Sequence, residues 1–196
     1  MKVWSTLALF VSLSAAAAVD MVVERREVHQ PYAFGATLKS APAVPEDAPA
    51  DYQTALITLP DALASRDASF QRRDSRKPRG TIAARDFYEC ATSGVAPKAT
   101  DCNVVVSNVF ATNQALVVAP GACLLFQFGT CWGFFCSLCQ QLGTDTDFIG
   151  SQLSTAQTLC VSKGSAGTLV GEAAPQWEAG FIRSNGALPN YAGDVC

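Results

Sequence analysis

The sequence predicts an α+β fold, a two-layer sandwich with helices on one side of a sheet, stapled by disulfides. Strand-like and helix-like segments follow one another after residue 86, and all eight cysteines lie between Cys90 and Cys196. One segment in this part alternates bulky with small side chains, as a strand does. The predicted order is strand, helix, strand, strand, helix, strand, which is the ferredoxin-like split βαβ (β-α-β-β-α-β) arrangement.

The first three elements follow from local patterns. Residues 87–91 begin with the aromatic pair Phe87 and Tyr88 and predict a short strand. Thr100 or Asp101 is a suitable cap for a helix after it. The apolar face of that helix repeats at helical spacing, in Val105, Val106, Val109 and Phe110. Residues 115–118 predict a strand that ends at the turn formers Pro120 and Gly121.

The segment 124–136 predicts one long central strand. Its even positions are mostly bulky: Leu124, Phe126, Phe128, Thr130, Trp132, Phe134 and Cys136. Its odd positions are small or polar apart from the two ends: Leu125, Gln127, Gly129, Cys131, Gly133 and Phe135. Because strand side chains alternate between faces, one face of this strand packs against helices. A membrane-inserting hairpin is the alternative, but Gln127, the glycines and the cysteines favour a stapled strand outside the membrane.

A second helix and a last strand complete the predicted domain. Thr144 or Asp145 caps the helix, and Asp145 and Asp147 suit its positive N-terminal end. The apolar face contains Phe148, Ile149, Leu153, Ala156 and Cys160. Glycines at 164 and 167 end the helix, and residues 168–170 form the last strand. A tail with Trp177, Phe181 and Ile182 then runs to Cys196.

An even number of cysteines confined to one part of an exported chain predicts a disulfide framework. The eight are Cys90, Cys102, Cys123, Cys131, Cys136, Cys139, Cys160 and Cys196. The split βαβ topology brings four of them to one pole: Cys90, Cys102, Cys123 and Cys160. We therefore expect two bridges within that set and two within the other: Cys131, Cys136, Cys139 and Cys196. This leaves nine connectivities, three within each set multiplied together.

Metal and redox chemistry are the alternatives for the pair Cys136 and Cys139. A zinc site would need a second close pair of ligands, and the remaining cysteines are dispersed with no histidine after residue 85. A reactive thiolate would need a nearby cation, and residues 102–144 contain no charged residue. We therefore expect no metal and no cofactor.

The N-terminus has the features of an export signal over residues 1–18. Lys2 precedes an apolar stretch, and four alanines at 15–18 offer a cleavage site. The apolar stretch is shorter than the roughly 20 residues that span a bilayer, so we expect a secreted protein without a stable membrane span.

Residues 19–85 predict a disordered leader, rich in proline and alanine and without cysteine. The pairs Arg25-Arg26 and Arg72-Arg73 are dibasic sites of the kind that secretory-pathway proteases cut in exposed chain. The mature domain is then expected over 86–196.

Composition and motifs argue against several functions. A net charge of −3 makes nucleic acid a poor partner. The sole histidine, His29, lies in the leader, so histidine-based nucleophile systems are excluded from the mature domain. Its carboxylates could hydrolyse glycosides only as a pair. The candidates stand in no recognisable motif: Asp101, Asp145, Asp147, Glu172, Glu178 and Asp194. We assign no catalytic residue.

The tail aromatics are the candidate binding surface. Trp177, Phe181 and Tyr191 could line a sugar-binding face, and Trp177 is expected to lie exposed or over the open face of the sheet. Trp132 is expected in the core. A cell-wall or carbohydrate-binding module is therefore the second of three functional hypotheses, and a secreted hydrolase is the third; the first follows from a resemblance described next.

Three segments resemble the necrosis-inducing effector and killer-toxin-like families of small secreted, cysteine-rich fungal proteins. They are the helix start at Asp101-Cys102, the turn at residues 120–123 and the strand at residues 128–131. The resemblance covers residues 87–196 and implies an α/β sandwich and toxicity to host or competitor cells. It transfers no functional residue. The first functional hypothesis is thus an extracellular effector or toxin-like protein that binds a host or competitor component without catalysis.

Overall fold

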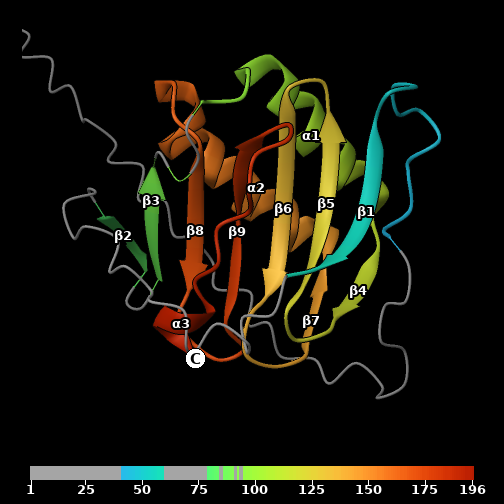
Figure 1. The fold of residues 1–196 in the computed structure, drawn as a ribbon. Helices are drawn as coiled ribbons and strands as arrows, with labels where there is room; N and C mark the ends of the chain where they lie inside the picture. Colours follow the sequence, from blue (N-terminus) through green and yellow to red (C-terminus); the bar gives the residue numbers. More distant parts are fainter. Residues whose placement is uncertain (1–40, 60–78, 84–85, 91, 93–94) are drawn as a thin grey trace, which may run out of the picture.

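The computed structural model describes residues 41–59, 79–83, 86–90, 92 and 95–196 (Figure 1). Within these ranges the elements are β1 Gln53–Thr58, β2 Arg79–Ala83, β3 Asp86–Cys90, α1 Ala99–Thr112, β4 Ala115–Val118, β5 Ala122–Phe128, β6 Cys131–Ser137, β7 Leu142–Asp145, α2 Thr146–Leu159, the 3₁₀ turn η2 Val161–Lys163, β8 Gly167–Gly171, β9 Trp177–Arg183 and α3 Ala192–Val195. The signal, Arg25, Arg26, Arg72 and Arg73 lie outside the described residues.

Seven strands form the main sheet in the order β1-β5-β6-β9-β8-β3-β2. Every described pairing is antiparallel. Strands β4 and β7 pair separately, also antiparallel. β1 and β2 therefore lie at opposite edges of the main sheet, with β9 at its middle (Figure 1).

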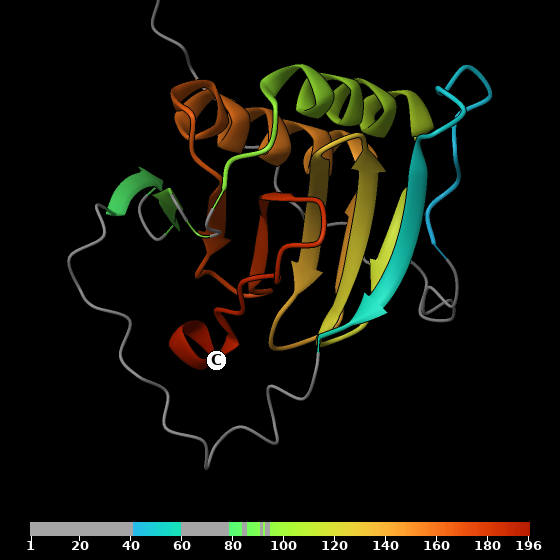
Figure 2. The same cartoon turned by 45° about the horizontal axis from the view of Figure 1, so that its top comes forward.

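The helices α1 and α2 cover one face of the main sheet, so the predicted two-layer α+β architecture is confirmed (Figure 2). Between the layers, α1 contributes Val105 and Val109 to the core, and α2 contributes Ile149 and Leu153, all fully buried. The sheet contributes aromatic side chains, such as Phe135 and Phe181, to the same core. Burial of these apolar surfaces from water is the main force that holds the layers together.

A second apolar cluster lies on the sheet face opposite the helices. Its centre is made by Leu125, Phe134, Val170 and Ile182. The C-terminal segment supplies its cover, because Leu188, Tyr191, Ala192 and Val195 pack against the same cluster. The sheet interior is thus buried on both sides over β6, β8 and β9, as the buried strand residues show.

The predicted long strand at 124–136 is wrong. The chain instead forms a hairpin, β5 and β6, joined by the two residues Gly129 and Thr130, with Phe128 opposite Cys131. Gly129 has a φ of +54° and Thr130 is not among the positive-φ residues, as in the tight hairpin turn that takes glycine first. The turn reverses the parity: Leu124 and Phe126 face the helices on β5, whereas Cys131 and Phe135 do so on β6.

The split βαβ arrangement is not confirmed. That fold needs the segment after α1 to return into the main sheet, but β4 pairs with β7 in a separate two-stranded sheet. The predicted tail supplies a strand instead: β9 pairs with both β6 and β8. Residues 168–170 were therefore not the last strand, although β8 itself is confirmed.

Part of the predicted disordered leader is ordered. β1 pairs with β5 over six residues, from Gln53 opposite Gln127 to Thr58 opposite Ala122. Tyr52 and Leu59 flank this strand and are 4% and 5% exposed. Side chains of β1 alternate between the two faces of the sheet. Leu56 packs on the helix side, and Ala55 and Ile57 pack on the other side, so both faces of β1 hold it in the sheet. Composition alone predicted disorder because the proline-rich leader, taken by itself, cannot bury enough surface to offset chain entropy.

The disulfide framework is confirmed, with all eight cysteines paired. The predicted division into two sets is wrong. The bridges Cys90–Cys160 and Cys139–Cys196 fall within the sets, but Cys102–Cys131 and Cys123–Cys136 cross between them. The hairpin is the cause: it places Cys123 directly opposite Cys136 and turns Cys131 toward α1, where Cys102 lies.

One of the two predicted helix caps is confirmed. The side chain of Asp145 accepts a hydrogen bond from the backbone N–H of Phe148 at 2.7 Å, at the N-terminus of α2. The N-cap of α1 is Lys98, which has no side-chain capping bond. In the parts of the chain that the structure describes, none of the helices has the length and apolar character needed to span a bilayer.

Candidate functional site

A hollow of about 280 Å³ opens at one end of the sheet, beside the turn between β5 and β6. Its lining consists of Asp51, Gln53, Gln127, Phe128, Gly129 and Trp132. Gln53 is opposite Gln127, and Gln127 is opposite Trp132, so three side chains stand in a row across β1, β5 and β6. Directly opposed residues project from the same face of a sheet. Trp132 packs against the apolar cluster on the face opposite the helices, so the row projects from the face that the helices do not cover.

The chemistry of the hollow is that of a small polar ligand site. Trp132 is half-buried and offers an indole, which combines a flat apolar surface with one N–H donor. Gln53 and Gln127 each offer an amide with donors and an acceptor, and Asp51 offers a carboxylate. Within the described chain, no hydrogen bond occupies these three polar side chains. A hollow with one aromatic wall and several convergent polar groups is suited to binding.

The aromatic surface predicted from the tail is not formed. Phe181 is fully buried on the helix side and Tyr191 is 4% exposed. Trp177 is half-buried and stacks on Phe135 with ring centroids 6.0 Å apart, and it meets Phe148 edge-on at 5.4 Å. β9 carries Trp177 and Phe181 in the helix-facing register, so neither reaches the open face. Trp132, which was expected in the core, is the tryptophan that lines the hollow.

Tyr191 instead makes hydrogen bonds to two buried glutamates on the sheet face opposite the helices. Its backbone N–H donates to Oε2 of Glu178 at 3.0 Å, and its hydroxyl donates to Oε2 of Glu89 at 2.6 Å. Its ring also meets Phe87 edge-on at 5.7 Å. Glu178 is fully buried and Glu89 is 8% exposed. Because Glu89 lies on β3 and Glu178 on β9, these two hydrogen bonds fix the C-terminal segment to both strands.

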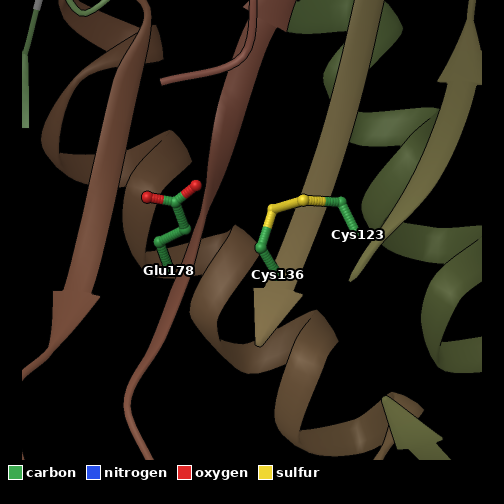
Figure 3. A group of neighbouring side chains, drawn as sticks. All are labelled: Cys123, Cys136 and Glu178. Atoms are coloured by element: carbon green, nitrogen blue, oxygen red, sulfur yellow. A yellow bond between two sulfur atoms is a disulfide. The ribbon is translucent and has the colours of Figure 1, made fainter. Parts of the chain in front are cut away.

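Glu178 also lies near the Cys123–Cys136 disulfide, as Figure 3 shows. The three residues come from β9, β5 and β6, and their ligand atoms lie within 4.8 Å of one another. Cysteine binds metal as the thiolate, and both sulfurs are committed to the disulfide. With the bridge formed, the group offers one carboxylate and no thiolate, so it does not provide a zinc ligand set.

Asp101 connects helix α1 to the turn between β5 and β6, beside the hollow. Its Oδ2 accepts hydrogen bonds from the backbone N–H of Thr130 at 2.8 Å and from its hydroxyl at 2.7 Å. These bonds lower the pKa of the Asp101 carboxyl, the backbone bond most of all. The carboxylate thereby ties the start of α1 to the hairpin turn that borders the hollow.

Sequence reasoning missed most of the hollow. Asp51 and Gln53 lie in the segment that was predicted to be a disordered leader. Gln127 was assigned to the face of small and polar residues on a single long strand. The available signal was Gly129-Thr130, a glycine-first pair between two alternating segments, which is typical of a hairpin. A hairpin at that point places Gln127 beside Trp132 at once.

The fold and the hollow define a disulfide-stapled α+β protein with a polar hollow at one end of the sheet face that the helices do not cover. Comparisons with protein-family models, with curated proteins and with solved structures find no match. The resemblance to necrosis-inducing and killer-toxin-like families rests on the three segments named above and stays a prediction.

Proposed function

We propose that this chain is a secreted, cysteine-rich effector or toxin-like protein that binds a host or competitor component outside the cell and catalyses no reaction. The hollow beside Trp132 carries the proposal, because it gathers binding groups on an accessible face. Four disulfides fit an oxidising, extracellular environment.

The test is exposure of candidate host tissue and competitor cells to the intact protein. Cell death or growth arrest is expected from the oxidised protein and not from the same protein after reduction and alkylation. The Trp132→Ala and Gln127→Ala variants should reduce the effect, since both lack a wall of the hollow. An unchanged effect in these variants would place the active surface elsewhere.

A cell-wall polysaccharide is the second candidate target, and the composition of the hollow favours it. The C–H face of a sugar ring packs against an indole, and amide and carboxylate groups pair with its hydroxyls. The volume of about 280 Å³ is near the lower end of ligand pockets, about 300–1,000 Å³, so it suits one sugar unit of a chain.

Pull-down on insoluble wall polysaccharides separates this candidate from a protein target. Trp132→Ala should weaken retention by about tenfold or more, as truncation of a binding-site anchor does. Gln53→Ala should weaken it as well, whereas Gln141→Ala, an amide deletion at an exposed position outside the hollow, should not. Equal retention of all variants would exclude the hollow as a sugar site.

A further inference from the structure

Strand β1 belongs to the sheet, although it lies before the predicted cleavage site. It forms the edge of the sheet through six paired residues with β5. Its flanks are anchored by the buried Tyr52 and Leu59. The backbone N–H of Leu59 donates to the carbonyl of Gly121 at 2.7 Å, which extends the ladder by one step.

The segment that precedes β1 is attached as well. The backbone N–H of Ala43 donates to Oε1 of Gln114 at 3.0 Å, beyond the end of α1. The hydroxyl of Thr54 donates to the carbonyl of Pro42 at 2.6 Å, which folds the segment back on β1. Residues 41–59 therefore contact the domain both along β5 and near α1.

No covalent bond besides the backbone joins residues 41–59 to the rest of the protein. The first cysteine of the chain is Cys90, and all four bridges lie after it. β1 and β2 stand at opposite edges of the sheet, and Arg72-Arg73 lies in the sequence between them. A cut after Arg73 would thus separate β1 from β2 without breaking a pairing among the strands that the structure describes.

We infer that cleavage after Arg73 yields two chains that stay together, with residues 41–59 held on the edge of β5 as a non-covalent seventh strand. Adding a separate chain to a sheet edge is an established mode of peptide binding, in which ladder hydrogen bonds give affinity. Departure of β1 would expose the unpaired backbone of β5 and remove Asp51 and Gln53 from the hollow.

The full-length secreted protein, isolated uncut and treated with a dibasic-specific protease, tests this inference. Under denaturing, non-reducing conditions the mass spectrum should show the piece that starts at residue 74 and a β1 piece that ends at Arg73, which starts at residue 27 where Arg25-Arg26 is cut as well. Under native conditions it should show one particle with their summed mass. A native particle that lacks the β1 piece would overturn the inference, and so would a protein that stays uncut between residues 59 and 79.

Two proline variants test the ladder itself. In an antiparallel pair, residues alternate between hydrogen-bonded and non-bonded positions. Because Leu59 bonds to Gly121, Ala55 occupies a bonded position opposite Leu125, and the N–H of Thr58 points away from β5. After cleavage, Ala55→Pro should release the β1 piece at least about tenfold faster than the native sequence, since it removes a ladder bond. Thr58→Pro should retain it.

Equal release from both variants would contradict the ladder geometry. If the Ala55→Pro protein is not secreted, a labelled synthetic peptide of residues 41–59 replaces it. This peptide should bind cut protein from which the resident β1 piece has been removed in urea before refolding, and the same peptide with Ala55→Pro should not. Equal binding of both peptides, or binding of neither, would overturn the inference.

Discussion

Two buried tyrosine hydroxyls have opposite environments, and they show how hydrogen bonding decides the cost of burial. Tyr52 is buried, and within the described chain its hydroxyl oxygen has no hydrogen-bond partner. This burial raises the pKa of the Tyr52 hydroxyl. The hydroxyl of Tyr191 donates to Glu89. Removal of the hydroxyl should therefore affect the stability of the fold differently at the two sites.

Tyr52→Phe should leave stability unchanged or raise it by up to about 1 kcal/mol, because it removes a buried hydroxyl that lacks a partner. Tyr191→Phe should lower stability by about 1–3 kcal/mol, because Glu89 loses a donor in a buried place. Urea unfolding of the two variants beside the native protein measures both. A loss at Tyr52 equal to that at Tyr191 would contradict the assigned environments.

Asp101→Asn should make the protein less stable at neutral pH but not in acid. The hydrogen bonds from Thr130 lower the pKa of Asp101 in the folded state, so the ionised carboxylate stabilises the fold above its ordinary pKa. That stabilisation disappears as the pH falls through the lowered folded-state value. We expect the free energy of unfolding of the native protein to exceed that of Asp101→Asn by about 1 kcal/mol at pH 7. This difference should become smaller below about pH 4.

Urea unfolding between pH 7 and pH 2.5 measures this difference. Thr130→Val is the control, because it removes the hydroxyl donor and keeps the backbone donor, so part of the pH dependence should persist. A difference between native protein and Asp101→Asn that does not change with pH would show that ionisation of Asp101 is not involved.

At the scale of elements, the hairpin between β5 and β6 organises this end of the molecule. It aligns Trp132 with Gln127, sets Cys123 opposite Cys136 and presents Thr130 to Asp101. All three consequences depend on a two-residue turn with glycine in the left-handed region.

Gly129→Ala should cost more stability than Gly121→Ala, although both glycines have positive φ, +54° and +69°. A Cβ on Gly121 meets nothing within 4 Å, so only the backbone cost of about 1 kcal/mol applies. A Cβ on Gly129 would lie 2.6 Å from Oδ2 of Asp101 and would displace it from Thr130. We expect about 2–3 kcal/mol there.

Thermal unfolding of both variants, in the native and Asp101→Ala backgrounds, tests this account. In the Asp101→Ala background the two glycine substitutions should cost the same, because the displaced carboxylate is absent. A persistent excess cost at Gly129 would mean that another contact limits the turn.

At the scale of the whole molecule, the four bridges span very different lengths of chain, from 13 to 70 residues. Cys90–Cys160 joins β3 to the end of α2 across a sequence separation of 70, whereas Cys123–Cys136 spans 13 within the hairpin. A longer closed loop restricts the unfolded chain more, so its bridge contributes more stability in the chain-entropy description.

Replacing both cysteines of a bridge by alanine should therefore cost about 4.4 kcal/mol for Cys90–Cys160 and about 3 kcal/mol for Cys123–Cys136. Guanidinium unfolding of the two double variants measures the costs. The ratio of peptide-mapped disulfides confirms that the other three bridges stay native. A larger cost for the hairpin bridge would show that packing of the buried sulfurs outweighs loop length.

Local sequence patterns were sufficient to predict a feature where neighbouring residues alone produce it. Asp145 begins α2 because a carboxylate pairs with the exposed N–H groups of a helix start. Ile149, Leu153 and Ala156 share the buried face that their spacing predicts. Within the uncharged stretch at 102–144, most residues of β5 and β6 are buried.

The sequence by itself determined the disulfide chemistry, the two long helices and the α+β class, because these follow from residue type and periodicity. Only the tertiary structure decided which cysteines pair, where Trp132 and Trp177 lie, and that residues 53–58 join the sheet. Each of these depends on contacts between segments far apart in the chain. A single two-residue turn reverses every side chain that follows it, so local periodicity cannot assign the faces of a sheet until the turn is located.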